Sequence, residues 1–186
     1  MYIGPALPQD SSVIAKHILL AMEEIAYQFI GERDYDKAYQ FIHALVSRRN
    51  NQYSFENCHV IKENGIVITS ALVYDGAQLH TLRKPVAQVI QEMFQKDFNP
   101  ENETGAGEFY IDCIGVDAEY QGKGLGSKML EYLIQEFVYN RKQNLGLLVD
   151  KNNPLAKRLY LRMGFQVTGE KTLADKEMEH LQYLSQ

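Results

Sequence analysis

The stretch of chain from residue 109 to residue 149 constrains the fold more than any other. It opens with Phe109–Val116, a mostly apolar run typical of a strand, and closes with a second apolar run at residues 145–149. Between these runs, apolar residues recur at the spacing of one helix face: Leu125, Met129, Leu133 and Phe137. Two strands joined through a helix need a crossover connection, which makes them parallel neighbours in a sheet. We therefore predict an α/β fold built around this unit.

Helical patterns precede this unit. We expect one helix from Ser11 to about residue 31 and a second from Asp34 to about residue 48, because each begins at a good capping residue and carries an apolar stripe. Pro85 suits the first turn of a third helix. The polar residues 99–107 that follow are expected to form an exposed loop.

Strand patterns complete the chain. The dipeptide Asn64-Gly65 between two β-branched runs predicts a hairpin. Extended segments are expected at four places outside the central unit: residues 60–61, 66–73, 165–168 and 178–184. Helix and strand alternate throughout with no linker-like composition, so residues 1–186 are predicted to form a single domain.

Charge and cysteine content narrow the function classes. The 19 Lys and Arg against 24 Asp and Glu give a net charge of −5, whereas a phosphate-backbone binder normally carries a basic patch, so we expect no nucleic-acid partner. Two cysteines, Cys58 and Cys113, are too few for a disulfide framework and suggest a reducing, cytoplasmic setting.

We expect no signal peptide and no membrane span. The five histidines match no metal-binding pattern, so no metal site is expected.

Three alternate glycines, Gly122, Gly124 and Gly126, join the strand of the central unit to its helix. Glycine lets a ligand approach the main chain closely, and a helix start presents unpaired N–H groups with partial positive charge, so this segment favours an anion such as phosphate. A Walker loop would need Ser or Thr after Lys123, and a dinucleotide fingerprint would need glycine at position 127 or 129. The Walker loop and the dinucleotide fingerprint are therefore both excluded. The alternative to an anion site is a turn that is merely rich in glycine.

The run QGKGLG at residues 121–126 resembles the pyrophosphate loop, Q/R-x-x-G-x-G/A, of the GCN5-related N-acetyltransferase (GNAT) family. A second block, residues 153–165, resembles the family segment N-x-x-A-x-x-L-Y-x-x-x-G-F and lies one strand and one helix beyond the loop. The resemblance covers about residues 109–165. It implies a mixed sheet that is flanked by helices and splayed between its fourth and fifth strands, here Phe109–Val116 and residues 145–149.

The resemblance also implies acetyl-CoA as co-substrate, with its pantetheine arm in the gap between the splayed strands. The residues implied to contact the arm are Ile114, Gly115 and Val116, through their backbone, and Asn153, Ala156 and Tyr160 from the other side. The loop implied to hold the pyrophosphate consists of Gln121, Gly122, Lys123, Gly124, Leu125, Gly126 and Ser127. For the Lys123 side chain, contact with phosphate and plain solvation both stay open.

The implied reaction is direct transfer of an acetyl group to the primary amine of a small molecule or peptide. Tyr160 is the expected general acid for the leaving thiolate. An alkylammonium lies about 4.6 kcal/mol from its nucleophilic form at neutral pH, so a base is needed. Asp112 is the expected base, because without a bulge it shares a strand face with Ile114, and Glu108 is the second candidate.

A non-catalytic acyl-CoA-binding module is the alternative function. Such a module would keep the glycine loop without needing a leaving-group acid, so Tyr160 favours the enzyme. No sequence motif identifies the acceptor, and the net charge only mildly favours a cationic amine. A homodimer through the C-terminal strand and the use of acyl groups other than acetyl stay open.

Overall fold

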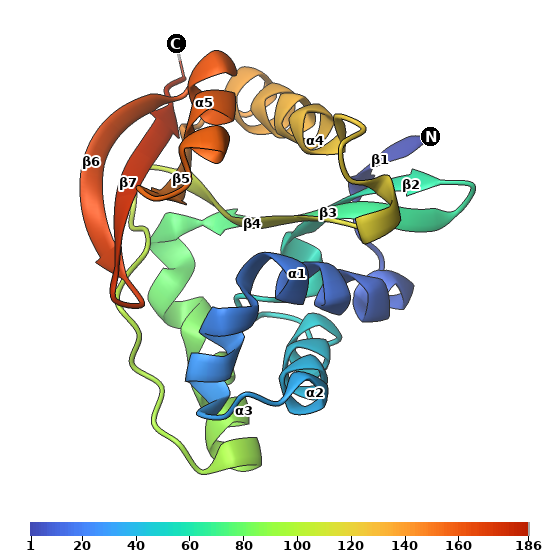
Figure 1. Cartoon of the computed structure of the whole chain (residues 1–186), viewed down its shortest axis with the longest axis vertical. Helices are drawn as coiled ribbons and strands as arrows, with labels where there is room; N and C mark the ends of the chain where they lie inside the picture. Colours follow the sequence, from blue (N-terminus) through green and yellow to red (C-terminus); the bar gives the residue numbers. More distant parts are fainter. Residues whose placement is uncertain (186) are drawn as a thin grey trace.

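The apolar runs and helical stripes fold into one open sheet with helices on both faces (Figure 1), in a computed structural model that describes residues 1–185. The elements in chain order are β1 (Tyr2–Pro5), α1 (Ser11–Ile30), α2 (Tyr35–Val46), β2 (Cys58–Glu63), β3 (Ile66–Asp75), α3 (Leu79–Phe94), β4 (Phe109–Val116), α4 (Leu125–Leu133), β5 (Leu145–Asp150), α5 (Pro154–Arg162), β6 (Gln166–Leu173) and β7 (Lys176–Tyr183). A π-helical turn, Ile134–Asn140, continues α4.

The seven strands lie in the order β1-β2-β3-β4-β5-β7-β6. β4 and β5 run parallel, which confirms the predicted crossover unit, and all other neighbours are antiparallel. The parallel pairing extends from Phe109 opposite Leu145 to Ile111 opposite Leu147, although β4 continues to Val116. The strands therefore separate beyond Ile111, which confirms the predicted splay between the fourth and fifth strands.

Each face of the sheet carries its own apolar core. α1, α2 and α3 cover one face, and α4 and α5 cover the other (Figure 1). The predicted stripe of α4 and its π-helical continuation is buried against the second face: Leu125, Met129, Leu133 and Phe137. The splay between β4 and β5 thus lies between two layers of helices.

Local sequence signals fix several element boundaries. The Asp34 side chain accepts a hydrogen bond from the Lys37 N–H at 3.0 Å and caps α2. Asn153 caps α5 in the same way through the Ala156 N–H at 3.1 Å. The predicted turn at residues 64–65 joins β2 to β3. Within residues 1–185, no helix is both long and apolar enough to cross a membrane.

The prediction that Pro85 begins the third helix is wrong, because α3 begins at Leu79 and contains Pro85 in its interior. Asp75 starts the preceding turn, since its side chain accepts a hydrogen bond from the Ala77 N–H at 3.0 Å. Proline removes the N–H that would bond the Thr81 carbonyl. Thr81 is exposed, so water can serve that carbonyl and the helix tolerates the proline.

The prediction that residues 99–107 form an exposed loop is also wrong in its middle. Glu103 and Thr104 are each only 5% exposed. Their polar groups find partners inside the protein, because Glu103 forms an ion pair with Arg83 of α3 and Thr104 Oγ1 donates to Glu108 at 2.6 Å. Long-range partners, which sequence spacing does not reveal, draw this polar segment inward.

Candidate active site

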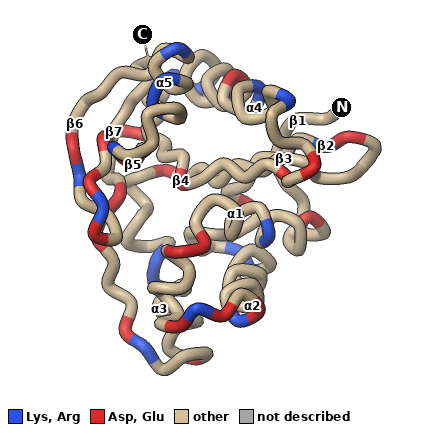
Figure 2. The backbone as a smooth tube through the Cα atoms, in the orientation of Figure 1, with Lys and Arg blue, Asp and Glu red and all other residues tan. Residues whose placement is uncertain are grey.

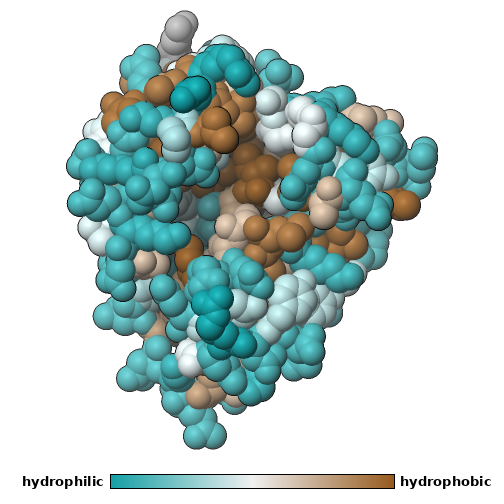
Figure 3. Space-filling model, in the orientation of Figure 1, coloured by the Kyte–Doolittle hydropathy of each residue, from teal (hydrophilic) through white to brown (hydrophobic). Residues whose placement is uncertain are grey.

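A cavity of about 530 Å³ opens where β4 and β5 separate. Figure 3 shows an apolar hollow in this region of the surface, between the two helical layers. The sheet and its helices contribute Met22, Ile25, Phe29, Asp112, Cys113, Ile114, Leu148 and Tyr160 to the lining. Met22 departs from helical backbone geometry, with φ −141° and ψ 36°, so α1 kinks where it borders the cavity.

A β-bulge sets the direction of Asp112. Leu72 of β3 pairs with Cys113 and Val73 pairs with Ile111, so Asp112 is an extra residue on β4. The bulge overturns the expectation that Asp112 shares a face with Ile114. Cys113 packs against the core under α1, α2 and α3, whereas Ile114 packs against the core under α4 and α5. The Asp112 carboxyl lies on the first of these two sides, where its hydrogen-bond partners are.

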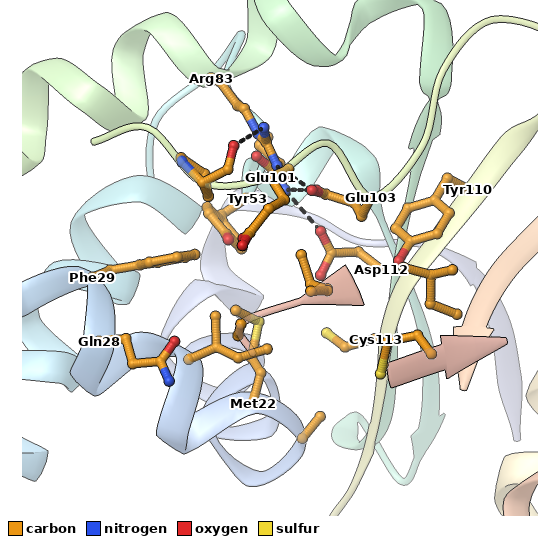
Figure 4. Close-up of a pocket in the computed structure, with 18 of the residues that line it drawn as sticks. Met22, Gln28, Phe29, Tyr53, Arg83, Glu101, Glu103, Tyr110, Asp112 and Cys113 are labelled. Carbon is orange, nitrogen blue, oxygen red and sulfur yellow. Dashed lines mark hydrogen bonds and ion pairs between the residues drawn. The ribbon is translucent and has the colours of Figure 1, made fainter. Parts of the chain in front are cut away.

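Those partners form a buried polar cluster of Gln52, Tyr74, Glu103 and Asp112, of which Figure 4 labels Glu103 and Asp112. Nε2 of Gln52 donates to Oε1 of Glu103 at 2.8 Å and to Oδ2 of Asp112 at 2.9 Å. The Tyr74 hydroxyl donates to the same Glu103 oxygen at 2.7 Å and lies 3.2 Å from Oδ2 of Asp112. Two carboxyl groups are therefore held side by side at the edge of the cavity.

This environment changes the acidity of Asp112. Burial and, next, the neighbouring charge of Glu103 raise the pKa of the Asp112 carboxyl to about 7. The hydrogen bonds from Gln52 and Tyr74 and the positive charge of Arg83 oppose part of that increase. A carboxyl with a pKa near neutrality is suited to exchange protons at neutral pH.

Tyr160 lines the same cavity from α5. Burial raises the pKa of its phenol, so the hydroxyl keeps its proton at neutral pH. Its ring packs edge to face against Phe165, with ring centroids 6.0 Å apart. The structure thus brings Tyr160 and Asp112, both singled out in the sequence, to one cavity.

The glycine loop precedes α4. Gly122 and Gly124 have φ values of 75° and 76°, the left-handed region that glycine adopts without steric cost. A Cβ built on Gly122, Gly124 or Gly126 would meet no heavy atom within 4 Å. The space beside the three Cα atoms is therefore open, as close approach of a ligand to this main chain would require.

Side chains of the loop are held on the protein surface. Nε2 of Gln121 donates to the Val116 carbonyl at 3.2 Å. Nζ of Lys123 lies 4.6 Å from the centre of the Tyr120 ring, in a cation–π contact. The side chains of Gln121 and Lys123 are thus engaged by neighbouring residues of the protein.

Glu108, the second candidate base, lies outside the cavity lining. It is 5% exposed and accepts hydrogen bonds from Thr104, from Nε2 of His180 at 2.9 Å and from Nε2 of Gln182 at 2.6 Å. Burial is the largest single influence and raises the pKa of the Glu108 carboxyl. The three hydrogen bonds together outweigh burial, so the pKa lies below its usual value. Glu108 joins the start of β4 to β7 and is not placed to take a proton from an acceptor.

Sequence reasoning missed Gln52, Arg83 and Glu103. Gln52 comes from the segment between α2 and β2, Arg83 from α3, and Glu103 from the segment before β4. None of them belongs to a motif, and their proximity to Asp112 arises only from the tertiary fold. A lone acidic residue in a polar loop, such as Glu103, gives no signal of burial.

Comparison with known proteins decides the family. The family model of the Acetyltransferase (GNAT) family matches residues 21–165. The chain belongs to this family. A crystal structure of an acetyltransferase has a TM-score of 0.85 and 25% identity to this acetyltransferase over the full length of both chains. An N-acetyltransferase from Staphylococcus aureus Mu50 shares the fold with a TM-score of 0.84 at 22% identity, over 98% of this chain and 100% of that chain.

Two further similarities are local. A spermine/spermidine N(1)-acetyltransferase of Bacillus subtilis (strain 168) is 41% identical over 75 residues, which are 40% of this chain and 48% of that protein. A 5-NmdU N-acetyltransferase of Pseudomonas phage PaMx11 is 40% identical over 65 residues, which are 35% of this chain and 44% of that protein. The acetyltransferase therefore aligns with about half the length of the curated relatives it matches.

Proposed function

We propose that this enzyme transfers the acetyl group of acetyl-CoA directly to a primary amine of a small polycationic acceptor of the polyamine class. The observation that carries the proposal is the charge of the cavity. Asp97, Glu101, Glu103 and Asp112 line it, and Arg83 is the one Lys or Arg among its lining residues in the described part of the chain. Because Arg83 is paired with Glu103, the carboxyl groups of Asp97 and Glu101 remain to attract a cation, and Asp112 joins them in its ionised form.

The apolar walls of the cavity favour the same acceptor. Met22, Ile25, Phe29 and Leu148 line it beside the acidic groups. A polyamine consists of ammonium groups joined by methylene chains, so it suits a cavity that combines carboxylates with apolar side chains. The similarity to a spermine/spermidine acetyltransferase over 75 residues agrees with this acceptor class.

Acetyl-CoA would be held between β4 and β5. The edge of β4 that faces β5 is unpaired after Ile111, so the backbone of Ile114, Gly115 and Val116 is available to an extended arm. The amides from Gly122 to Ser127 would bind the pyrophosphate, with Asn153 and Ala156 of the α5 start on the other side of the arm.

Surface charge supports this placement. Basic residues occur on α5 and near the start of α4 (Figure 2), whereas the cavity is acidic. α5 contains Lys157, Arg158 and Arg162 and no Asp or Glu; Lys157 is paired with Glu179 of β7 at 2.7 Å, so Arg158 and Arg162 carry the basic character of this helix. The anionic co-substrate and the cationic acceptor would therefore approach surfaces of opposite charge.

The proton transfers follow from the two side chains already described. Asp112 accepts a proton from the acceptor ammonium, and the free amine attacks the thioester carbonyl. The new C–N bond forms, the C–S bond breaks, and Tyr160 donates its phenolic proton to the leaving thiolate. The nitrogen gives its second proton to solvent water as the amide forms, so one proton is released overall. Asp112 and Tyr160 then exchange protons with solvent to restore the starting state.

An acceptor panel tests the function. Release of free CoA from acetyl-CoA is measured with spermidine, spermine, butylamine, amino acids and a peptide with a free amino terminus, and without acceptor as control. We expect kcat/KM for spermidine to exceed that for butylamine by about tenfold or more, since one additional ammonium–carboxylate contact of about 1.4 kcal/mol suffices. Preference for the peptide would contradict the acceptor class. Binding of acetyl-CoA without CoA release from any amine would favour the acyl-CoA-binding module.

A further inference from the structure

Residues 97–101 and Glu103 form one wall of the cavity, and Arg83 of α3 bonds to the second half of this segment (Figure 4). Its Nη1 donates to the Pro100 carbonyl at 3.2 Å and to Oδ1 of Asn102 at 3.0 Å. Its Nη2 donates to the Glu101 carbonyl at 2.8 Å and forms an ion pair with Glu103. One guanidinium therefore binds four consecutive residues.

We propose that Arg83 is a positioning residue that holds residues 97–104 against the cavity and thereby keeps Glu103 beside Asp112. The inference rests on the proposed function, because Asp112 is the base of that reaction. Arg83 does not touch the acceptor in this role. It acts through Glu103.

The geometry requires an arginine. The planar guanidinium offers donors in a fixed fork, so it can serve acceptors on successive residues, whereas a lysine ammonium is a single point. The pair is also protected from water, since the side chains of Arg83 and Glu103 are 11% and 6% exposed. Ordering a polar segment between α3 and β4 has an entropic cost, and the four bonds of Arg83 offset part of it together with the hydrogen bonds that Gln52 and Tyr74 donate to Glu103.

The position of Glu103 controls the proton affinity of Asp112. The charged groups that face Asp112 are Glu103, which raises its pKa, and Arg83, which lowers it. The other titratable neighbours have pKa values raised by burial and stay neutral near pH 7: Tyr53, Tyr74, Tyr110, Cys58 and Cys113. Loss of Glu103 from this position would lower the pKa of Asp112, whereas loss of the Arg83 charge alone would raise it. The direction of the shift in an Arg83 variant therefore reports which role Arg83 has.

The test is the pH profile of kcat/KM for acetyl transfer to spermidine by Arg83→Gln. If Arg83 positions Glu103, the variant releases Glu103 and the apparent pKa of Asp112 falls by about one unit or more. KM for spermidine rises about tenfold, because the acceptor site loses its shape and charge. If Arg83 is only a charge near Asp112, its loss raises the apparent pKa, and that result overturns the proposal. An unchanged profile overturns it too.

Two variants establish that Arg83 acts through Glu103. Glu103→Gln should lower the apparent pKa as Arg83→Gln does, and the double variant should resemble either single variant. Additive shifts would contradict the proposal. Arg49→Gln is the matched control, because Arg49 pairs with Glu56 on the surface and should leave the profile unchanged. Should Arg83→Gln fail to fold, Arg83→Lys keeps the charge with a single nitrogen and should shift the profile in the same direction.

Hydrogen exchange separates this proposal from the proposed function. Arg83→Gln should speed amide exchange in residues 97–104, while Arg49→Gln should not. That readout needs no substrate. Faster exchange with no acetyl transfer to any amine would leave the positioning role intact and refute the function, whereas unchanged exchange would refute the positioning role.

Discussion

At the scale of single residues, Tyr160 is the side chain on which the proposed chemistry depends most directly. Tyr160→Phe keeps the ring and its contact with Phe165 but removes the proton donor. General acid catalysis is worth about 10²- to 10⁴-fold, so kcat should fall at least about 100-fold while acetyl-CoA affinity changes little. Pre-steady-state kinetics must show that chemistry limits turnover. Near wild-type turnover by the phenylalanine variant under that condition would leave Tyr160 only a packing role.

The raised pKa of Asp112 leads us to expect that kcat/KM depends on pH near neutrality. A pKa of about 7 means that the carboxylate required as base forms as the pH rises through neutrality, so kcat/KM should increase between about pH 6 and 8. Asp112→Asn should abolish that rise and lower kcat/KM by about 10²-fold or more. A profile with the same rising limb in the asparagine variant would assign the titration to another group.

At the scale of elements, the turn before α4 is predicted to bind the co-substrate. Gly124→Glu fills the open space beside the loop and adds a negative charge where the pyrophosphate would lie. Calorimetric titration should show acetyl-CoA affinity reduced at least about tenfold. Gly65→Glu is the matched control, because Gly65 in the β2–β3 turn has a similar φ of 84°. A Cβ built on it would also meet no heavy atom within 4 Å. Equal affinities of the two variants would remove the loop from the site.

The packing of α1 on β4 depends on Gly115. A Cβ at this position would lie 2.2 Å from the His17 carbonyl oxygen, which belongs to the backbone of α1 and cannot rotate away. Gly115→Ala should lower the free energy of unfolding by about 1–3 kcal/mol, measured by urea denaturation. Gly169→Ala, whose Cβ would meet no atom within 4 Å, should change stability little. Equal stabilities would show that α1 shifts without cost.

The sequence predicted those parts of the fold and site that local patterns encode. The β4-α4-β5 unit, the hairpin turn and the glycine loop follow from periodicity and turn chemistry. The bulge at Asp112 was not predictable, since it reflects how β3 and β4 align. Arg83 and Glu103 meet Asp112 only through tertiary contacts. Pro85 lies inside α3 because the preceding turn, begun by Asp75, starts the helix earlier than the proline suggests.

At the scale of the whole molecule, the net charge of −5 is unevenly distributed between regions of the protein. α5 contains three basic residues and no acidic residue, whereas four carboxyl groups and one guanidinium line the cavity beyond the separation of β4 and β5. In the proposed reaction, anionic acetyl-CoA would lie on the side of α5 and the cationic amine in the acidic cavity. The two would meet only at the splay, where Asp112 and Tyr160 lie.

A crystal structure of the enzyme with CoA and spermidine tests this central claim most directly. We expect the pantetheine arm between β4 and β5, with its sulfur within hydrogen-bond reach of the Tyr160 hydroxyl. We also expect a primary amine within about 3 Å of the Asp112 carboxyl, directly or through one water. Pantetheine bound elsewhere, or a spermidine whose amines all lie away from Asp112 while the sulfur occupies the splay, would contradict it.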